Sequence, residues 1–405
     1  QDIWMKTNFD AGNTSCLAVR SNGDIFVGTY NAGAYYSSDN GNNWIRITQG
    51  LAALQVNTFF INYKGEHLEN SEGDIFAGTR SGVFRSSDGL INWIKVNSID
   101  DITSFTADSI GNLLAGSWNH GILWSCNYGV VWHEISGDIQ NLAVQSIEIN
   151  SFGQIYAGTV YGNKGIYRSD DGGASWSIIK DSLSIMDLEI NSQGDIFAAT
   201  QLQGIFRSTD NGDSWVKINN GLSDTTKVYC LTISTSEKLY AGTENGVYYS
   251  EDKGDSWNNI SEGLKFDQNG HIYIHSIAVD SSKYLYVAST DGVYRSLNPI
   301  TNIEQSSYSE EMPNNYTLYQ NYPNPFNPST TIKYQIPKNE KREMSNVKLI
   351  VYDILGKEVA IIVDKNQKPG SYEIEFNGRD LTSGIYFYRL KTSDFVVTKK
   401  MILLK

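Results

Sequence analysis

Three carboxylates stand out because they lie on two predicted strands of neighbouring repeats. Glu148 lies in the segment 145–150, and Asp187 and Glu189 lie in the segment 185–190. Apolar and polar residues alternate in both segments, which predicts strands with the carboxylates on one face. Several oxygen ligands of this kind suit a calcium ion. The alternatives are that the three are solvated in a wet channel, or that two of them form a catalytic carboxylate pair.

A second group of candidate residues is aromatic, polar or charged, and lies in loops that vary while the flanking strands do not. Such side chains around a concave surface could hold a glycan or a peptide. The alternative interpretation is that these are ordinary solvated loops. The candidate ligand-binding residues are Tyr30, Arg80, Trp118, His120, Tyr161, Lys164, Gln201 and Glu244.

Other familiar chemistry is missing from the sequence. It contains no nucleophile elbow, no phosphate-binding loop and no zinc motif, so we assign no catalytic residue and, apart from the calcium alternative, no cofactor. The three cysteines, Cys16, Cys126 and Cys230, fall in separate repeats. They cannot form a disulfide framework and are expected to be buried thiols.

The elements that must position these residues repeat along the chain. Residues 194–215 read as strand, turn, strand and then a polar turn of the form Ser-x-Asp-x-Gly-x-x-Trp. The Ser and Asp side chains can accept hydrogen bonds from backbone amides inside the turn, the Gly allows a positive φ, and the Trp covers the turn. These turn residues are therefore structural, not catalytic. Their acidic position holds Asp39, Asp88, Asn127, Asp171, Asp210 and Asp252, and the second turn has Leu90 in place of Gly.

The polar turns recur about every 40–45 residues with four predicted strands each, which is typical of a β-propeller. An insertion at residues 63–70 explains one longer spacing. A seventh unit loses its outer strand after Ser296, and residues 3–6 offer a spare one with Trp4 at the position of the turn Trp. The sequence thus predicts an all-β chain with a seven-bladed propeller over residues 1–298, closed by its N-terminal strand. Closure removes sheet edges that invite aggregation.

The polar turn resembles the Asp-box repeat, also called the bacterial neuraminidase (BNR) or sialidase-like repeat. Sialidases also need an arginine cluster around the substrate carboxylate. Here several arginines fill one recurrent strand position before the turn Ser, which indicates a scaffold role; they are Arg85, Arg168, Arg207 and Arg295. Xyloglucan-cleaving glycosidases are similar in repeat pattern but place their carboxylates between two propellers, and only one is predicted here. The resemblance therefore implies the propeller fold but does not imply an enzymatic activity.

The composition changes near residue 300. All seven prolines lie at Pro299 or later, and all nine tryptophans lie at Trp257 or earlier. The first part is acidic, which disfavours nucleic acid as a partner. Residues 299–314 are poor in hydrophobic residues and read as a linker. Residues 315–405 contain five or six short predicted strands, which suggests a small Ig-like β-sandwich.

This last segment resembles the type A C-terminal sorting domain of the type IX secretion system. The resemblance implies that residues 315–405 interact with the type IX machinery and that the protein reaches the extracellular space or outer-membrane surface of a Gram-negative bacterium. A signal peptide is expected to have been removed before Gln1. The matching residues are Tyr322-Pro323-Asn324-Pro325-Phe326, Val351-Tyr352-Asp353-Ile354-Leu355-Gly356, Gly384-Ile385-Tyr386-Phe387-Tyr388-Arg389-Leu390 and Lys399-Lys400.

Three functions fit these observations. The first is a secreted, non-enzymatic propeller that binds a glycan, peptide or protein partner through its loop-rich mouth. The second is a self-assembling structural subunit of an extracellular surface layer or filament, with the sorting domain retained. The third is a glycoside hydrolase or lyase that uses the channel carboxylates.

Overall fold

A computed structural model describes the chain as two compact units, Gln1–Ser307 and Tyr308–Lys405. It describes residues 2–62, 73–86, 92–108, 110–127, 129–139, 142–300, 316–319, 321, 324–337, 345–368, 370–393 and 395–404. The predicted insertion at 63–70, Asp88 with Leu90, and most of the predicted linker lie outside these residues. No helix within the described ranges is long and apolar enough to cross a membrane.

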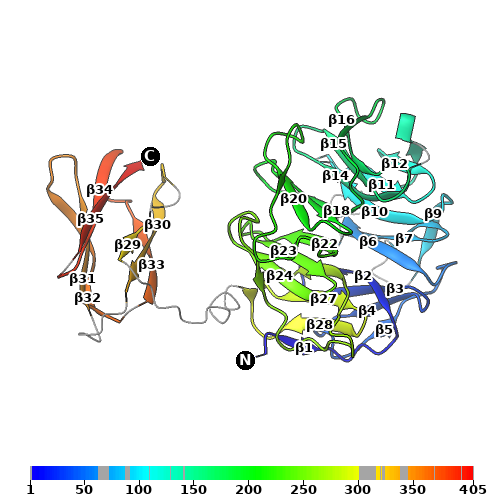
Figure 1. Cartoon of the computed structure of the whole chain (residues 1–405), viewed down its shortest axis with the longest axis horizontal. Coiled ribbons are helices and arrows are strands. Elements are labelled where there is room, and N and C mark those ends of the chain that lie inside the picture. Colours follow the sequence, from blue (N-terminus) through cyan, green and yellow to red (C-terminus); the bar gives the residue numbers. More distant parts are fainter. Residues whose placement is uncertain are drawn as a thin grey trace. The chain divides into compact units, whose positions relative to one another are not determined.

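The first unit is built from four-stranded antiparallel sheets arranged like propeller blades around a common centre (Figure 1). Its described residues form seven such sheets. The innermost strands are β2 (Thr14–Val19), β6 (Val56–Asn62), β10 (Ile102–Ala107), β14 (Val144–Ile149), β18 (Ile185–Ile190), β22 (Val228–Ile233) and β26 (Ile274–Val279). Each contacts the innermost strand of the next sheet, and β26 contacts β2, so the row of sheets returns on itself.

The second strand of each sheet is buried at every residue that it contains. These strands are β3 (Ile25–Thr29), β7 (Asp74–Thr79), β11 (Leu113–Ser117), β15 (Ile155–Thr159), β19 (Ile196–Thr200), β23 (Leu239–Thr243) and β27 (Leu285–Ser289). Simple alternation would leave one face of these strands in water. Because both faces of each blade pack against neighbouring blades, the strands form continuous buried runs instead.

The third strands lead into the polar turns, and short outer strands follow them. The third strands are β4 (Ala34–Ser37), β8 (Gly82–Ser86), β12 (Gly121–Ser125), β16 (Gly165–Ser169), β20 (Ile205–Ser208), β24 (Gly246–Ser250) and β28 (Gly292–Ser296). The outer strands are β5 (Ile45–Arg46), β9 (Ile94–Asn97), β13 (His133–Glu134), β17 (Ser177–Asp181), β21 (Val216–Lys217), β25 (Asn258–Asn259) and, from the N-terminus, β1 (Trp4–Lys6). A short 3₁₀ turn, η1 (Gly137–Ile139), precedes β14.

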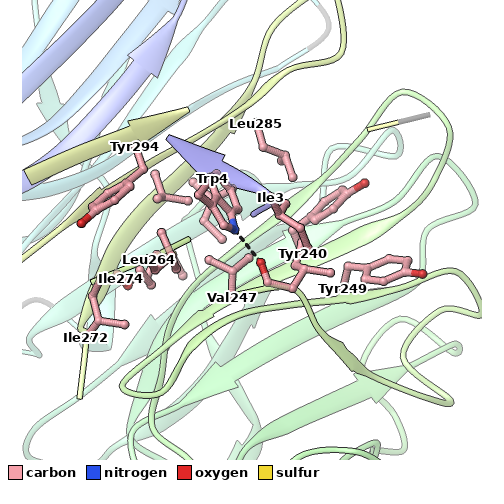
Figure 2. Packing of buried hydrophobic residues seen from close by; sticks show 14 of the residues in the cluster. Ile3, Trp4, Tyr240, Val247, Tyr249, Leu264, Ile272, Ile274, Leu285 and Tyr294 are labelled. Carbon is pink, nitrogen blue, oxygen red and sulfur yellow. Dashed lines mark hydrogen bonds between the residues drawn. The ribbon is translucent and has the colours of Figure 1, made fainter. Parts of the chain in front are cut away.

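The N-terminal strand completes the last sheet, as the sequence predicts. Strand β1 pairs antiparallel with β28, and Trp4 lies opposite Ser296. The Trp4 side chain is buried among Ile3, Val247 and Tyr294, and its indole N–H donates to the carbonyl oxygen of Ile260 (Figure 2). Residues from the two ends of the unit therefore share one core.

The polar turns have the hydrogen bonds that their sequence predicts. After β20, the Ser208 hydroxyl accepts the Gly212 N–H at 2.8 Å and donates to Asp210 at 2.7 Å. Gly212 has a φ of 94°, and Trp215 donates its indole N–H to the Gly212 carbonyl oxygen at 3.0 Å. Hydrogen bonds from Ser214 and Ser208 lower the pKa of Asp210 to about 2. The turn aspartate is thus an ionised acceptor committed to the turn.

The recurrent arginines also have scaffold partners, which confirms their predicted role. Arg85 pairs with Asp74 at 2.6 Å beside the second sheet. Arg207 donates to the Lys253 carbonyl oxygen at 2.7 Å, so it links its blade to the polar turn of the next blade. Arg295 instead stacks on Tyr284, with 3.7 Å between the guanidinium carbon and the ring centroid.

The second unit contains two antiparallel sheets that share one hydrophobic core. One sheet has the order β29 (Thr317–Leu318), β30 (Ser329–Ile336), β33 (Gly370–Asn377). The other has the order β32 (Glu358–Gln367), β31 (Ser345–Tyr352), β34 (Gly384–Lys391), β35 (Val396–Leu403). Ile332 and Tyr334 from the first sheet lie in the same buried cluster as Leu349, Tyr388 and Met401 from the second.

Candidate functional site

Every innermost strand of the first unit has a register shift between its first and third residues. A bulge of this kind leaves one residue without a ladder partner and redirects its side chain. In β14, for example, Val144 is fully buried, while the next residue, Gln145, lines an open cavity. The seven residues at the register shifts are Ser15, Asn57, Thr103, Gln145, Met186, Tyr229 and His275.

All seven of these residues line one cavity of about 470 Å³, here called the mouth cavity. It lies at the end of the first unit where the innermost strands begin. Loop residues complete its wall; they are Tyr30, Gln55, Arg80, Asp101 and Trp118. Because each innermost strand contributes one residue, the mouth cavity is centred where the sheets converge.

The mouth cavity contains three of the eight predicted ligand-binding residues, Tyr30, Arg80 and Trp118. Tyr161 lies next to it, because its ring packs against the edge of Trp118 with 5.3 Å between ring centroids. More than half of the Tyr161 side chain remains exposed. The pair therefore extends an aromatic surface outward from the cavity.

The other four predicted residues have partners elsewhere. His120 Nε2 lies 2.8 Å from Asp100 Oδ1, and Glu244 pairs with Lys227 at 3.3 Å. Gln201 accepts a hydrogen bond from the Ser184 hydroxyl at 3.2 Å. Lys164 lines a separate cavity of about 620 Å³ together with Tyr167 and Trp176 of the fourth repeat.

Hydrogen bonds between blades fix part of the mouth cavity. Asn57 donates to the Ile102 carbonyl oxygen at 2.9 Å, and Thr103 donates to the Val144 carbonyl oxygen at 2.6 Å. Ser15 makes the equivalent bond to the carbonyl oxygen of Val56. These three side chains tie each strand to the next, so their donors are used by the scaffold.

A further part of the wall of the mouth cavity is aromatic. His275 lies between Tyr30 and Tyr229, at centroid distances of 5.7 Å and 6.1 Å. Burial lowers the pKa of His275 to about 4, so the imidazole is neutral at neutral pH. Burial also raises the pKa of Tyr229 to about 12, which keeps its phenol protonated. This side thus presents uncharged aromatic groups.

Below the mouth cavity, the third and fifth residues of the innermost strands carry the predicted carboxylates. Asp187 accepts hydrogen bonds from the Ser146 hydroxyl at 3.0 Å and from the Leu231 N–H at 2.8 Å, and so joins β14, β18 and β22. Glu148 accepts from the Thr106 hydroxyl at 3.3 Å. All three carboxyl side chains are half-buried and enclosed by protein.

This enclosure changes the acidity of all three groups. Burial, with the negative charge of Asp187, raises the pKa of Glu148 to about 8. Burial raises the pKa of Asp187 to about 6, and burial with the charge of Glu148 raises the pKa of Glu189 well above its usual value. Across the described residues, no three His, Cys, Asp or Glu side chains are grouped to share a metal ion. The calcium alternative stays a prediction.

Sequence reasoning missed the register-shift residues because it applied a strict period of two to the innermost strands. One sequence signal points to them. Opposite the third residue of these strands, the second strand has Gly in five sheets, Gly28, Gly78, Gly116, Gly158 and Gly242. A Cβ on Gly158 would lie 2.4 Å from Ile185 Cγ2. Gly inside a strand often marks a bulge or a close approach of two chains.

The end of the chain matches a known protein family. Residues 320–404 match the family model described as the secretion system C-terminal sorting domain. This match agrees with the resemblance seen in the sequence and indicates a secreted protein. The comparison with curated protein sequences gave no match.

Several solved structures share the fold at low sequence identity. PorZ of Porphyromonas gingivalis, described as an essential bacterial surface component of the type-IX secretion system, is 15% identical with a TM-score of 0.55; the alignment covers 99% of this chain and 61% of PorZ. The extracellular domain of BT4673 from B. thetaiotaomicron is 13% identical with a TM-score of 0.59, over 100% of this chain and 59% of that one. The chain thus spans about three-fifths of both.

A third similar structure has about the size of the first unit. YCF48 bound to D1 peptide is 13% identical with a TM-score of 0.57, and the alignment covers 74% of this chain and 97% of YCF48. At these identities the similarity establishes a propeller-like fold and nothing about activity.

Proposed function

We propose that this chain is a secreted, non-enzymatic β-propeller that binds a partner in its mouth cavity. The partner is a glycan, a peptide or a protein. The observation that carries the proposal is the convergence of seven register-shift residues and five loop residues on one cavity. A concave site with aromatic walls and a few polar groups is the usual form of a ligand site. The YCF48 structure, which contains a bound peptide, supports the use of this fold for binding.

The proposal includes the architecture and the route of export. The first unit is a closed seven-bladed propeller of Asp-box repeats, and the second is an Ig-like sandwich. The sorting domain match supports export by the type IX secretion system to the extracellular space or the outer-membrane surface. The secretion machinery is then the partner of the second unit.

The experiment is a binding screen of the full chain against glycan and peptide arrays, followed by titration of each hit. A double substitution, Tyr30→Ala with Trp118→Ala, removes two aromatic walls of the mouth cavity. We expect it to weaken binding at least tenfold, because truncating a stacking aromatic side chain usually costs about 1–3 kcal/mol.

The matched control is Leu202→Ala, which truncates an exposed side chain on an equivalent loop of the fifth sheet. Leu202 is not among the residues that line the mouth cavity. The control should bind as the unaltered protein does. Equal binding by the double variant, or an array without any hit, would refute the proposed function.

A further inference from the structure

The mouth cavity has an excess of hydrogen-bond donors that the protein leaves unused. Within the described part of the chain, no partner contacts the Arg80 guanidinium, the Trp118 indole N–H or the hydroxyls of Tyr30 and Tyr229. The indole of Trp118 is unusual in this respect. Seven other tryptophans donate to backbone carbonyl oxygens; they are Trp4, Trp44, Trp93, Trp132, Trp176, Trp215 and Trp257.

Acceptors are scarcer in the same cavity. Asp101 is its one carboxylate, and one of its oxygens already accepts from Asn119 Nδ2 at 3.1 Å. The Gln55 side-chain amide donates to Asn57 Oδ1 at 3.0 Å. Asp101 also has a φ of 51°, a left-handed conformation that is uncommon outside Gly and costs backbone energy. This loop lies beside Arg80, because the Asp101 N–H donates to the Arg80 carbonyl oxygen at 3.3 Å.

The lining of the mouth cavity contains one carboxylate, Asp101, and one cation, Arg80. His275 does not add a second cation, because its imidazole is neutral at neutral pH. Arg80 has no ion-pair partner among the described residues. A guanidinium without a partner binds a carboxylate through two parallel hydrogen bonds. The donor excess and the free guanidinium therefore favour an anionic ligand that is rich in acceptors.

We propose that the ligand of the mouth cavity is an acidic glycan, whose uronic acid carboxylate binds Arg80 while a sugar ring packs against Trp118. This inference rests on the proposed function and specifies its ligand. A glycan is favoured over a peptide because the apolar part of the lining consists mainly of flat aromatic rings, on which sugar rings stack, and Met186 is its one aliphatic side chain. Tyr161, packed on Trp118, supplies a surface for the next sugar of the chain.

The test uses the full chain and calorimetric titration with three uronate oligosaccharides, built from galacturonate, glucuronate or mannuronate. Each has a matched probe in which the carboxylates have been reduced to neutral alcohols. We expect at least one uronate to bind and its reduced form to bind about tenfold to a hundredfold more weakly, as for loss of a charged hydrogen bond. Binding should weaken as salt rises.

Two variants test whether the Arg80 guanidinium itself binds the uronate carboxylate. Arg80→Gln should weaken uronate binding by the same factor and weaken binding of the reduced probe much less. Lys164→Gln removes the same charge from a loop outside the mouth cavity and should change neither affinity.

Three results would overturn the inference. They are equal affinity for a uronate and its reduced form, no binding of any uronate while neutral glycans bind, and tighter binding of an acidic peptide. None of these would refute a binding role for the mouth cavity. The binding role of the mouth cavity is refuted if the double variant Tyr30→Ala with Trp118→Ala binds every ligand as tightly as the unaltered protein does.

Discussion

The indole N–H of Trp4 donates to the carbonyl oxygen of Ile260, so the fourth residue of the chain is bonded to the sixth repeat. The Trp4 side chain is 2% exposed and lies in a cluster with residues from β24, β26 and β28. Strands β2 to β25, which form six of the seven sheets, lie between these two residues in the sequence. Their contact therefore couples the N-terminal strand energetically to the sixth repeat.

Trp4→Ala is expected to destabilise the first unit strongly. Truncating a buried Trp removes apolar burial and leaves a cavity, which typically costs about 3–5 kcal/mol. Urea denaturation followed by tryptophan fluorescence measures the change. Ile45→Ala, on the exposed outer strand β5, serves as the control and should change stability by less than about 0.5 kcal/mol. Equal midpoints for both variants would show that β1 does not hold the ring.

Ser208→Ala tests the polar turn. The Ser208 hydroxyl is buried and accepts the Gly212 N–H, so its loss leaves a buried donor without a partner. The expected cost is about 1–3 kcal/mol of unfolding free energy, measured by the same denaturation. Ser223→Ala removes an exposed loop hydroxyl and should be nearly neutral. A neutral Ser208→Ala would mean that water replaces the hydroxyl.

The stability of the first unit should fall as pH rises from about 4.5 to 8. The pKa of Glu148 is about 8 in the folded chain and 4.5 in its ordinary state. Below pH 4.5 both states hold the proton; above it the unfolded chain releases the proton while the folded chain keeps it. Ionisation therefore favours unfolding over this interval.

Glu148→Gln removes the part of this pH dependence that comes from Glu148, because the amide cannot ionise, whereas Asp187 and Glu189 still titrate. We expect the variant to match the unaltered protein at pH 4 and to exceed its stability at pH 8 by on the order of 1–3 kcal/mol. Thermal unfolding at a series of pH values measures this. Glu134→Gln, an exposed substitution on β13, should keep the original pH profile. If Glu148→Gln keeps the original dependence of stability on pH, groups other than Glu148 cause that dependence.

The repeat pattern predicted much of the fold, because the polar turns after β4, β12, β16, β20 and β24 share the hydrogen bond from the Gly N–H to the Ser hydroxyl. The pairing of β1 with β28 was also predictable, since the last repeat lacks an outer strand and residues 3–6 have a Trp at the right position. The second strands were less predictable, because burial on both faces removes the alternation from their sequence.

The candidate site was predicted in part. The loop residues Tyr30, Arg80 and Trp118 were predictable because their loops differ in sequence from repeat to repeat, whereas the flanking strands do not. Gln145 and its six equivalents were not, because a register shift of one residue reverses which side chains face the axis. Glu148 and Asp187 lie beyond the register shift, where the period of two holds again, and so their shared face was predicted.

The pairing of β1 with β28 also sets an order of events during synthesis and export. Strand β1 must wait for the last strand of its unit, so the ring can close only after residue 296 has been added. The sorting domain follows this point in the chain. Any chain that carries its sorting domain has therefore already acquired every strand needed to close the ring, and a chain terminated before β28 lacks both.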